Sequence, residues 1–220
     1  HWNGATCAAL IAKAKSPPLL DPYLALLEDH LVKWPSGGTA DKARWWLGQS
    51  RQSQRRWSDA ARAFAGISPD FAEYPVAIRR WGECVENQLQ EDQAAAKLAA
   101  DAPAKVIAEL ERRYVAGDGK LPVKWDAAQS EAAIAAARLR LRWMPNSAEE
   151  TARQLGALVR ASPEGPGSQA ARRWLVVALA AAAKSDEAML QLESLKEATP
   201  PEWLSILRQI AATSRAAPIA

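Results

Sequence analysis

Apolar residues recur every three or four positions along most of the chain, and breaks rich in Pro, Gly and Ser separate these stretches. Asp21-Pro22 is typical of a helix start, with an N-cap followed by proline at the first helical position. The pattern predicts helices over residues 21–34, 39–54, 57–65, 74–89, 91–100, 106–114 and 125–143, and further helices starting near 147, 168, 185 and 199. In all we expect eleven or twelve helices and no strand, with short connections that make successive helices antiparallel neighbours.

One stretch of this pattern occurs twice. The residues from Pro35 onward align without a gap with those from Pro163, at an offset of 128. Identical or similar pairs include Pro35/Pro163, Gly37/Gly165, Ala43/Ala171, Arg44/Arg172, Trp46/Trp174, Leu47/Leu175, Asp59/Glu187, Ala60/Ala188 and Ile67/Leu195. A duplicated helical hairpin is typical of a stacked array, in which no unit buries its apolar face alone.

Helical spacing also predicts which side chains are buried. Trp46, Trp57, Trp81 and Trp174 fall on apolar stripes and are expected in the core. His30 flanks the stripe of Leu27 and is expected on the helix surface. Two segments have the sequence of a capping box, in which a Ser or Thr and a Glu satisfy free amides at a helix start: Ser147 to Glu150 and Thr199 to Glu202.

The composition is that of a globular helical protein that needs no metal or disulfide to fold. The 220 residues are 49% hydrophobic, enough to bury about 70–75% of the unfolded surface. The net charge of +3 lacks the strong basic excess of nucleic-acid binders, and no apolar run is long enough to span a bilayer. The chain opens at His1 rather than Met, so we expect a processed product or a piece of a longer protein.

The chemistry-bearing residues do not form a catalytic pattern. With only His1 and His30, a Ser-His-Asp triad or a zinc site lacks members. We therefore expect no enzyme activity, no catalytic or metal-binding residues and no cofactor. Cys7 and Cys84 are either a disulfide or two small buried apolar residues, and both readings stay open.

The first copy of the hairpin resembles the tetratricopeptide repeat. Leu47-Gly48 stands where that family has a Leu-Gly pair, Trp57 opens the second helix, and Ala60 and Phe64 follow Gly48 at the family's spacing. A small side chain lets the two helices approach closely, and the aromatic residues fill the space between hairpins.

The second copy resembles the family less completely. Ala188, Leu192 and Leu195 fit the second helix and Pro200 stands at the terminating proline, but Val176 replaces the glycine. A third, weaker trace joins Trp143 to Gly156, with Leu155-Gly156 taken as a further copy of Leu47-Gly48. The resemblance implies one all-α, right-handed solenoid of antiparallel hairpins over residues 1–220, clearest at 39–66 and 168–197.

In the resembled family the first helix of each hairpin lines a concave groove that holds a partner. The groove positions map here to a set of five partner-binding candidates: Lys42, Trp45, Gln49, Gln52 and Arg173. Val177 takes the remaining groove position of the second copy. Trp45 adjoins a predicted core residue and points off its stripe, so it is either a contact residue or buried against a neighbouring hairpin.

A local basic stretch bears on the kind of partner. Between Lys42 and Arg62 six basic residues stand against Asp59 alone, either as a patch for an acidic partner or as a solvated face. The first hypothesis is a non-enzymatic scaffold or adaptor that binds a protein or peptide segment, with acidic partners favoured. The alternative is a non-catalytic helical module of a larger envelope or cell-wall enzyme, as in the superhelical domains of lytic transglycosylases. An RNA-reading repeat is disfavoured because Lys42 and Gln49 do not recur at Ala170 and Val177. The sequence leaves the compartment and the oligomeric state open.

Overall fold

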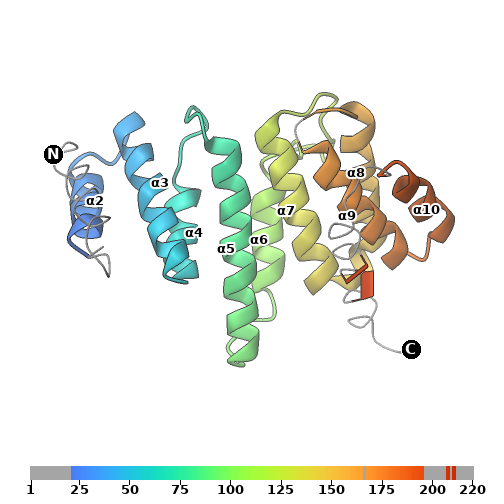
Figure 1. Ribbon diagram of the computed structural model, residues 1–220, viewed down its shortest axis with the longest axis horizontal. Helices are drawn as coiled ribbons and strands as arrows, with labels where there is room; N and C mark the ends of the chain where they lie inside the picture. Colours follow the sequence, from blue (N-terminus) through green and yellow to red (C-terminus); the bar gives the residue numbers. More distant parts are fainter. Residues whose placement is uncertain (1–20, 166, 196–206, 209, 212–220) are drawn as a thin grey trace. The chain divides into compact units, whose positions relative to one another are not determined.

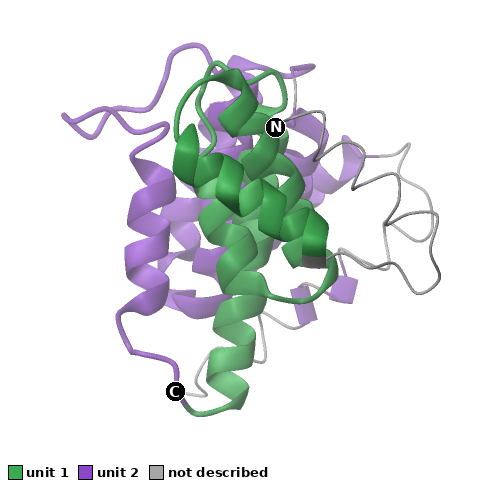
Figure 2. Ribbon diagram, turned by 90° about the vertical axis from the view of Figure 1, so that its left-hand side faces the viewer, with its two compact units in different colours: residues 1–96 green, residues 97–220 purple. Residues whose placement is uncertain are grey.

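The computed structural model describes residues 21–165, 167–195, 207–208 and 210–211. The chain divides into two compact units, residues 1–96 and 97–220, coloured green and purple in Figure 2. The described residues form nine α-helices and one short 3-10 helix, with no strand among them (Figure 1). The prediction of an all-α protein is confirmed, and each unit is described by itself below.

Unit 1 contains four described helices in chain order. They are α2 (Asp21–Lys33), α3 (Gly38–Ser53), α4 (Trp57–Ala65) and α5 (Tyr74–Ala94). Each packs on the next along the chain. The predicted break after residue 89 is wrong, because α5 continues to Ala94 and no separate helix covers 91–100. Leu89 is buried and the Trp57 indole donates to Glu91 Oε1 at 2.7 Å, so this last part of α5 is bonded to α4.

Unit 2 contains five described α-helices. They are α6 (Ala102–Glu111), α7 (Ala127–Trp143), α8 (Ala148–Ala161), α9 (Ser168–Ala181) and α10 (Ser185–Glu193), with the 3-10 helix η1 (Pro145–Ser147) before α8. Each α-helix again packs on the next, and α7 also contacts α9.

Helix starts in unit 2 differ from the predicted caps. The capping box predicted at Ser147 is wrong, because its hydroxyl donates to the Met144 carbonyl at 2.6 Å and caps no amide. A capping box that the sequence analysis missed starts α7, where Asp126 and Gln129 bond reciprocally. The box predicted at Thr199 to Glu202 lies outside the described residues.

The duplication seen in the sequence recurs in the structure. α4 and α10 begin and end at positions 128 residues apart. Arg44 donates to the Pro35 carbonyl at 2.5 Å, and its counterpart Arg172 donates to the Pro163 carbonyl at 3.0 Å. Ala43 and Ala171 are both fully buried. The repeated Ala-Arg sequence therefore has the same two structural roles in both units: the alanine packs in the core, and the arginine ties the preceding loop to its helix.

The ends of α3 and α9 are also the same. Arg55 and Ala183 each adopt a left-handed conformation with φ 57°. The next amide in each case, of Arg56 and of Lys184, bonds to a carbonyl five residues back, at 2.9 Å. This is the Schellman pattern, which usually has glycine at the left-handed position because a Cβ is disfavoured there.

We therefore expect Ala183→Gly to stabilise unit 2 by about 0.5–1 kcal/mol. Relief of the left-handed strain outweighs the added chain entropy of glycine. Urea denaturation followed by circular dichroism measures the change. The control is Ala182→Gly, at φ −85°, which is expected to destabilise because it gains only the entropy. Equal effects of the two substitutions would contradict the strain argument.

The duplication extends one helix further than the sequence comparison reached. α2 precedes α3 as α8 precedes α9, and the same offset of 128 aligns Leu27 with Leu155, both fully buried. α2–α3–α4 and α8–α9–α10 thus follow the same order and have matching positions 128 residues apart, and each set is called a three-helix module. Figure 1 labels these helices. The matching positions correct the third trace, which aligned α8 with α3; its counterpart is α2.

Several burial predictions are corrected by the structure. Trp46 is 43% exposed rather than buried, whereas Trp81 is buried as predicted and Trp57 and Trp174 are half-buried. His30 is only 4% exposed, and its ring lies 5.1 Å from that of Trp34, so its predicted surface position is wrong. Cys84 is buried, which raises the pKa of its thiol to about 12. Cys7 lies outside the described residues.

Candidate partner-binding face

Trp45 lies half-buried between three helices of unit 1 rather than projecting freely. Its ring centroid is 5.8 Å from that of Phe64 in an edge-to-face arrangement and 6.1 Å from that of Phe71. The Arg80 guanidinium carbon lies 5.5 Å from the Trp45 ring centroid, a cation–π contact. Trp45 therefore packs on neighbouring elements and retains an exposed portion, and its role as a contact residue stays a prediction.

Arg80 is the residue of this cluster that the sequence analysis missed. It projects from α5, and its Nη1 donates to Gln52 Oε1 on α3 at 2.7 Å. Arg80 of α5 thus contacts two of the four α3 candidates, Trp45 and Gln52. Nothing in the local sequence around Arg79-Arg80 indicates this contact, because it depends on how α5 packs against α3.

The remaining two α3 candidates complete one face. Lys42 is exposed one turn before Trp45, and Gln49 is half-buried one turn after it. The four α3 candidates and Arg80 together form the α3 face: Lys42, Trp45, Gln49, Gln52 and Arg80. This face presents the Trp45 ring, which Arg80 holds in place, together with the side-chain amides of two glutamines and the positive charge of Lys42.

Gly48 explains which side of α3 faces α4. A Cβ built on Gly48 would lie 2.7 Å from the Phe64 ring, so α3 and α4 approach closely at this position, as the glycine predicted. This approach turns Gly48 and Leu47 toward α4 and the core. Trp45 consequently lies against Phe64, and Trp46 faces outward.

The basic stretch 42–62 is not a uniform positive surface. Arg51 bonds to Glu28 at 2.5 Å, Arg44 to Asp41 at 3.2 Å, and Arg56 and Arg62 share Asp59 at 2.5 and 3.5 Å. Two of these carboxylates, Glu28 and Asp41, lie outside the stretch in sequence. In the part of the chain that is described, Lys42 and Arg55 are the members without an ion pair, so the stretch gives weaker support for an acidic partner than its sequence indicated.

The fifth candidate, Arg173, belongs to unit 2 and is half-buried on α9. The other groove position of that copy, Val177, is fully buried, so this part of α9 is core rather than groove. Trp174 lies 5.8 Å below the guanidinium of Arg138 from α7. The structure therefore joins four of the five candidates on one face and leaves Arg173 in a separate environment.

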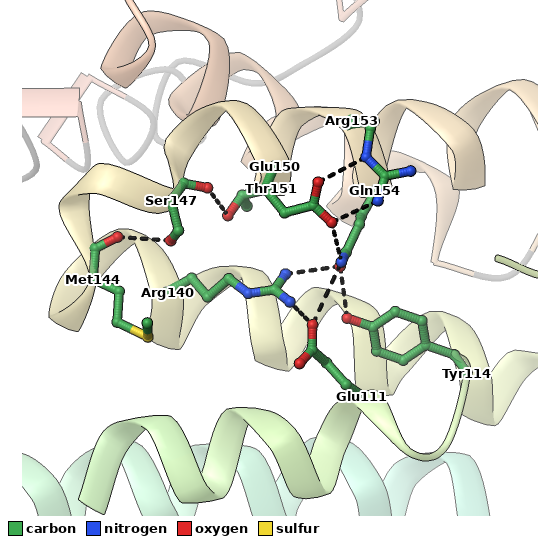
Figure 3. A network of polar contacts seen from close by, with 9 residues as sticks. All are labelled: Glu111, Tyr114, Arg140, Met144, Ser147, Glu150, Thr151, Arg153 and Gln154. Carbon is green, nitrogen blue, oxygen red and sulfur yellow. Dashed lines mark hydrogen bonds and ion pairs between the residues drawn. The ribbon is translucent and has the colours of Figure 1, made fainter. Parts of the chain in front are cut away.

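Unit 2 contains a buried polar network around Gln154 of α8 (Figure 3). Gln154 Oε1 accepts from Tyr114 Oη at 2.8 Å and from Arg140 Nη1 at 2.7 Å. Its Nε2 donates to Glu150 Oε1 at 2.8 Å and to Glu111 Oε1 at 3.4 Å. Arg140 also forms an ion pair with Glu111. The network links α6 and the turn after it to α7 and α8.

The electrostatics of this network follow from burial and pairing. Burial lowers the pKa of Arg140 and raises that of the Tyr114 phenol, since each charged form loses its hydration. Hydrogen bonds from Arg153 are the main cause that lowers the pKa of Glu150. Arginine stays charged at neutral pH in spite of this lowering because its ordinary pKa is far above neutral, and the lowered pKa keeps the Glu150 carboxylate ionised. The network therefore holds three segments together by charge-assisted bonds.

Within the described residues no group of His, Cys, Asp and Glu side chains is placed to hold a metal ion. Nor is any helix among those residues both long and apolar enough to cross a membrane. Comparisons with protein-family models, with curated proteins and with solved structures find no match for this chain.

Proposed function

We propose that the protein is a non-enzymatic scaffold that binds a peptide or protein segment on the α3 face. The observation that carries the proposal is the arrangement of Trp45. Its ring is fixed by Phe64, Phe71 and Arg80 before any partner arrives, so binding does not have to order it. A pre-organised aromatic with a cation and amides beside it is the composition of a binding hot spot.

The finer architecture that we propose is a tetratricopeptide-like, right-handed solenoid. The repeated three-helix module, the close approach of α3 and α4 at Gly48 and the packing of each helix on the next support it. In such an array the first helices of successive hairpins line one face, and the bond from Arg80 of α5 to Gln52 of α3 is consistent with that arrangement.

The test is a comparison of affinity capture by the native chain and by three variants. Lys42→Glu and Trp45→Ala are expected to weaken partner recovery by tenfold or more, the loss of about 1.4 kcal/mol or more. The control is Trp34→Ala, which removes an exposed tryptophan in the loop before α3 that is not part of the α3 face. Lys42 is exposed, so its substitution leaves the packing of Trp45 intact.

Equal recovery by all three variants would refute the α3 face as the binding surface. Loss with Trp34→Ala but not with Lys42→Glu would move the surface away from α3, to the end of α2. Circular dichroism of each variant separates loss of binding from loss of fold.

A further inference from the structure

Unit 2 has a groove of about 450 Å³ on the surface of α8, α9 and α10. Its floor is made of Ala152 and Gly156 from α8 and Leu175 and Leu179 from α9. Ion pairs lie along its rim: Glu149 with Lys184 at 2.9 Å and Glu150 with Arg153 at 2.6 Å. This groove is separate from the α3 face, which belongs to unit 1.

The duplicated module shows what fills the same place in unit 1. The offset of 128 aligns Ala152 with Leu24, Gly156 with Glu28, and Leu179 with Arg51. In unit 1, Leu24 is buried, and Arg51 spans from α3 to Glu28 of α2 at 2.5 Å. Unit 1 therefore has a leucine and an ion pair at this place, and unit 2 has shorter or uncharged side chains at all three positions.

Two positions in and beside the groove keep their residue type. The neighbouring positions keep their residue types, Leu27 with Leu155 and Leu47 with Leu175. Leu155 is fully buried beneath the groove like its counterpart, so α8 packs on α9 in the register that α2 has on α3. The groove thus coincides with three positions at which unit 2 has shorter or uncharged side chains than unit 1.

We propose that this groove is a second docking site, which takes an amphipathic helix of a partner protein. Ala152 and Gly156 lie one turn apart on α8, so the floor is a strip along which a helix backbone can approach closely. Ala152 stands where unit 1 has Leu24, so the space beside this smaller side chain fits a leucine-like residue of the occupant. A row of such residues at helical spacing matches the strip.

The rim charges specify the rest of the occupant. Three acidic and three basic side chains line the groove: Glu149, Glu150, Glu187, Arg153, Arg160 and Lys184. A surface with both signs is complemented by a helix that carries both signs beside its apolar stripe, rather than by a uniformly acidic or basic segment.

The test selects peptides and then closes the groove. A displayed library of 16-residue peptides with leucine at helical spacing and Glu or Lys at the flanking positions is selected against the native chain. Gly156→Glu with Leu179→Arg rebuilds the ion pair of unit 1 within unit 2. A Cβ at Gly156 meets only the flexible end of Arg160, at 3.2 Å, whereas Leu179 is buried, so Gly156→Glu alone is tested beside the double variant and circular dichroism checks that both fold. Enriched peptides should bind the double variant at least about tenfold more weakly than the native chain.

Two controls make the result specific to the groove. Lys42→Glu, on the α3 face, should leave peptide affinity unchanged. Leu24→Ala with Glu28→Gly and Arg51→Leu gives unit 1 the three groove residues of unit 2 and should add peptide binding there. No enrichment, or equal binding to the native chain and the closed variant, would overturn the proposal. A change of oligomeric state on closing the groove would assign it to a second copy of the chain, and a structural change confined to residues 196–220 would assign it to the chain itself; either overturns the partner helix.

Discussion

Replacing Glu111 with alanine is expected to lower the free energy of unfolding of unit 2 by about 3 kcal/mol. Glu111 supplies the direct carboxylate partner of Arg140, whose side chain is only 7% exposed. Without it a positive charge stays buried, bonded to a neutral amide of Gln154 and with Glu150 as the nearest remaining carboxylate. Removing one member of a buried pair leaves the desolvation cost of the other uncompensated.

The matched control is Glu109→Ala on the same helix. Glu109 pairs with Arg112, whose side chain is 74% exposed, and more weakly with Arg113 at 3.7 Å, so its loss should cost about 1 kcal/mol or less. Urea denaturation followed by circular dichroism gives both free energies, and hydrogen exchange of the α7 amides assigns the loss to unit 2. Glu111→Gln, which keeps an acceptor for Arg140, should fall between them. Equal costs for Glu111→Ala and Glu109→Ala would show that the buried pair adds nothing beyond a surface one.

The helices could be predicted from the sequence because their signals are local. α4 has the predicted bounds, and α3 is displaced by one residue at each end. Proline and apolar spacing mark these ends within a few residues of each position. The duplication could be predicted for the same reason, since it needs only a comparison of the chain with itself.

The buried polar network could not be predicted because its members are distant in sequence. Gln154 accepts from a tyrosine 40 residues before it and from an arginine 14 residues before it, across three segments. A sequence pattern places Arg140 on a helix but does not say that this arginine is turned inward. The sequence analysis accordingly did not single out Arg140.

The sequence predicted Trp46 in the core, whereas in the structure Trp45 packs inward and Trp46 is exposed. Tertiary packing here overrides a periodic pattern. Both are large apolar residues, and a 3.6-residue period does not choose between adjacent positions. Gly48 decides the choice, because the approach of Phe64 at this position turns α3 so that Trp45 is inside. The glycine and its partner were recognised in the sequence, but their effect on Trp45 required the geometry of the hairpin. The same holds for Arg80, which completes the candidate face from another helix.

The second large effect is expected for Gly48→Val, at about 3 kcal/mol of destabilisation of unit 1. The new Cβ would lie 2.7 Å from the Phe64 ring, well inside van der Waals contact. Phe64 is fully buried and packs against Trp45 on another side, so its ring cannot move away without disturbing that contact. The helices must then separate or the ring must leave its rotamer.

The second module indicates how this cost can be removed. Val176 and Leu192 stand at the positions of Gly48 and Phe64, and the α9–α10 hairpin forms with Val176 buried. A larger residue on one helix is thus accompanied by a smaller one on the other. Gly48→Val combined with Phe64→Leu should therefore recover at least half of the lost stability, a coupling that a double-mutant cycle in urea denaturation measures.

Gly156→Ala is the control for glycine itself. Gly156 also follows a leucine within a helix, but a Cβ there meets only the flexible Arg160 side chain. Alanine should be neutral or stabilising by up to about 1 kcal/mol, from helix propensity. If Gly48→Val and the double variant proved equally unstable, the close approach of Phe64 would not be the cause, and the inward position of Trp45 would need another explanation. If the double variant recovers, the exchange of size between the two positions explains how one duplicated hairpin accommodates two different cores.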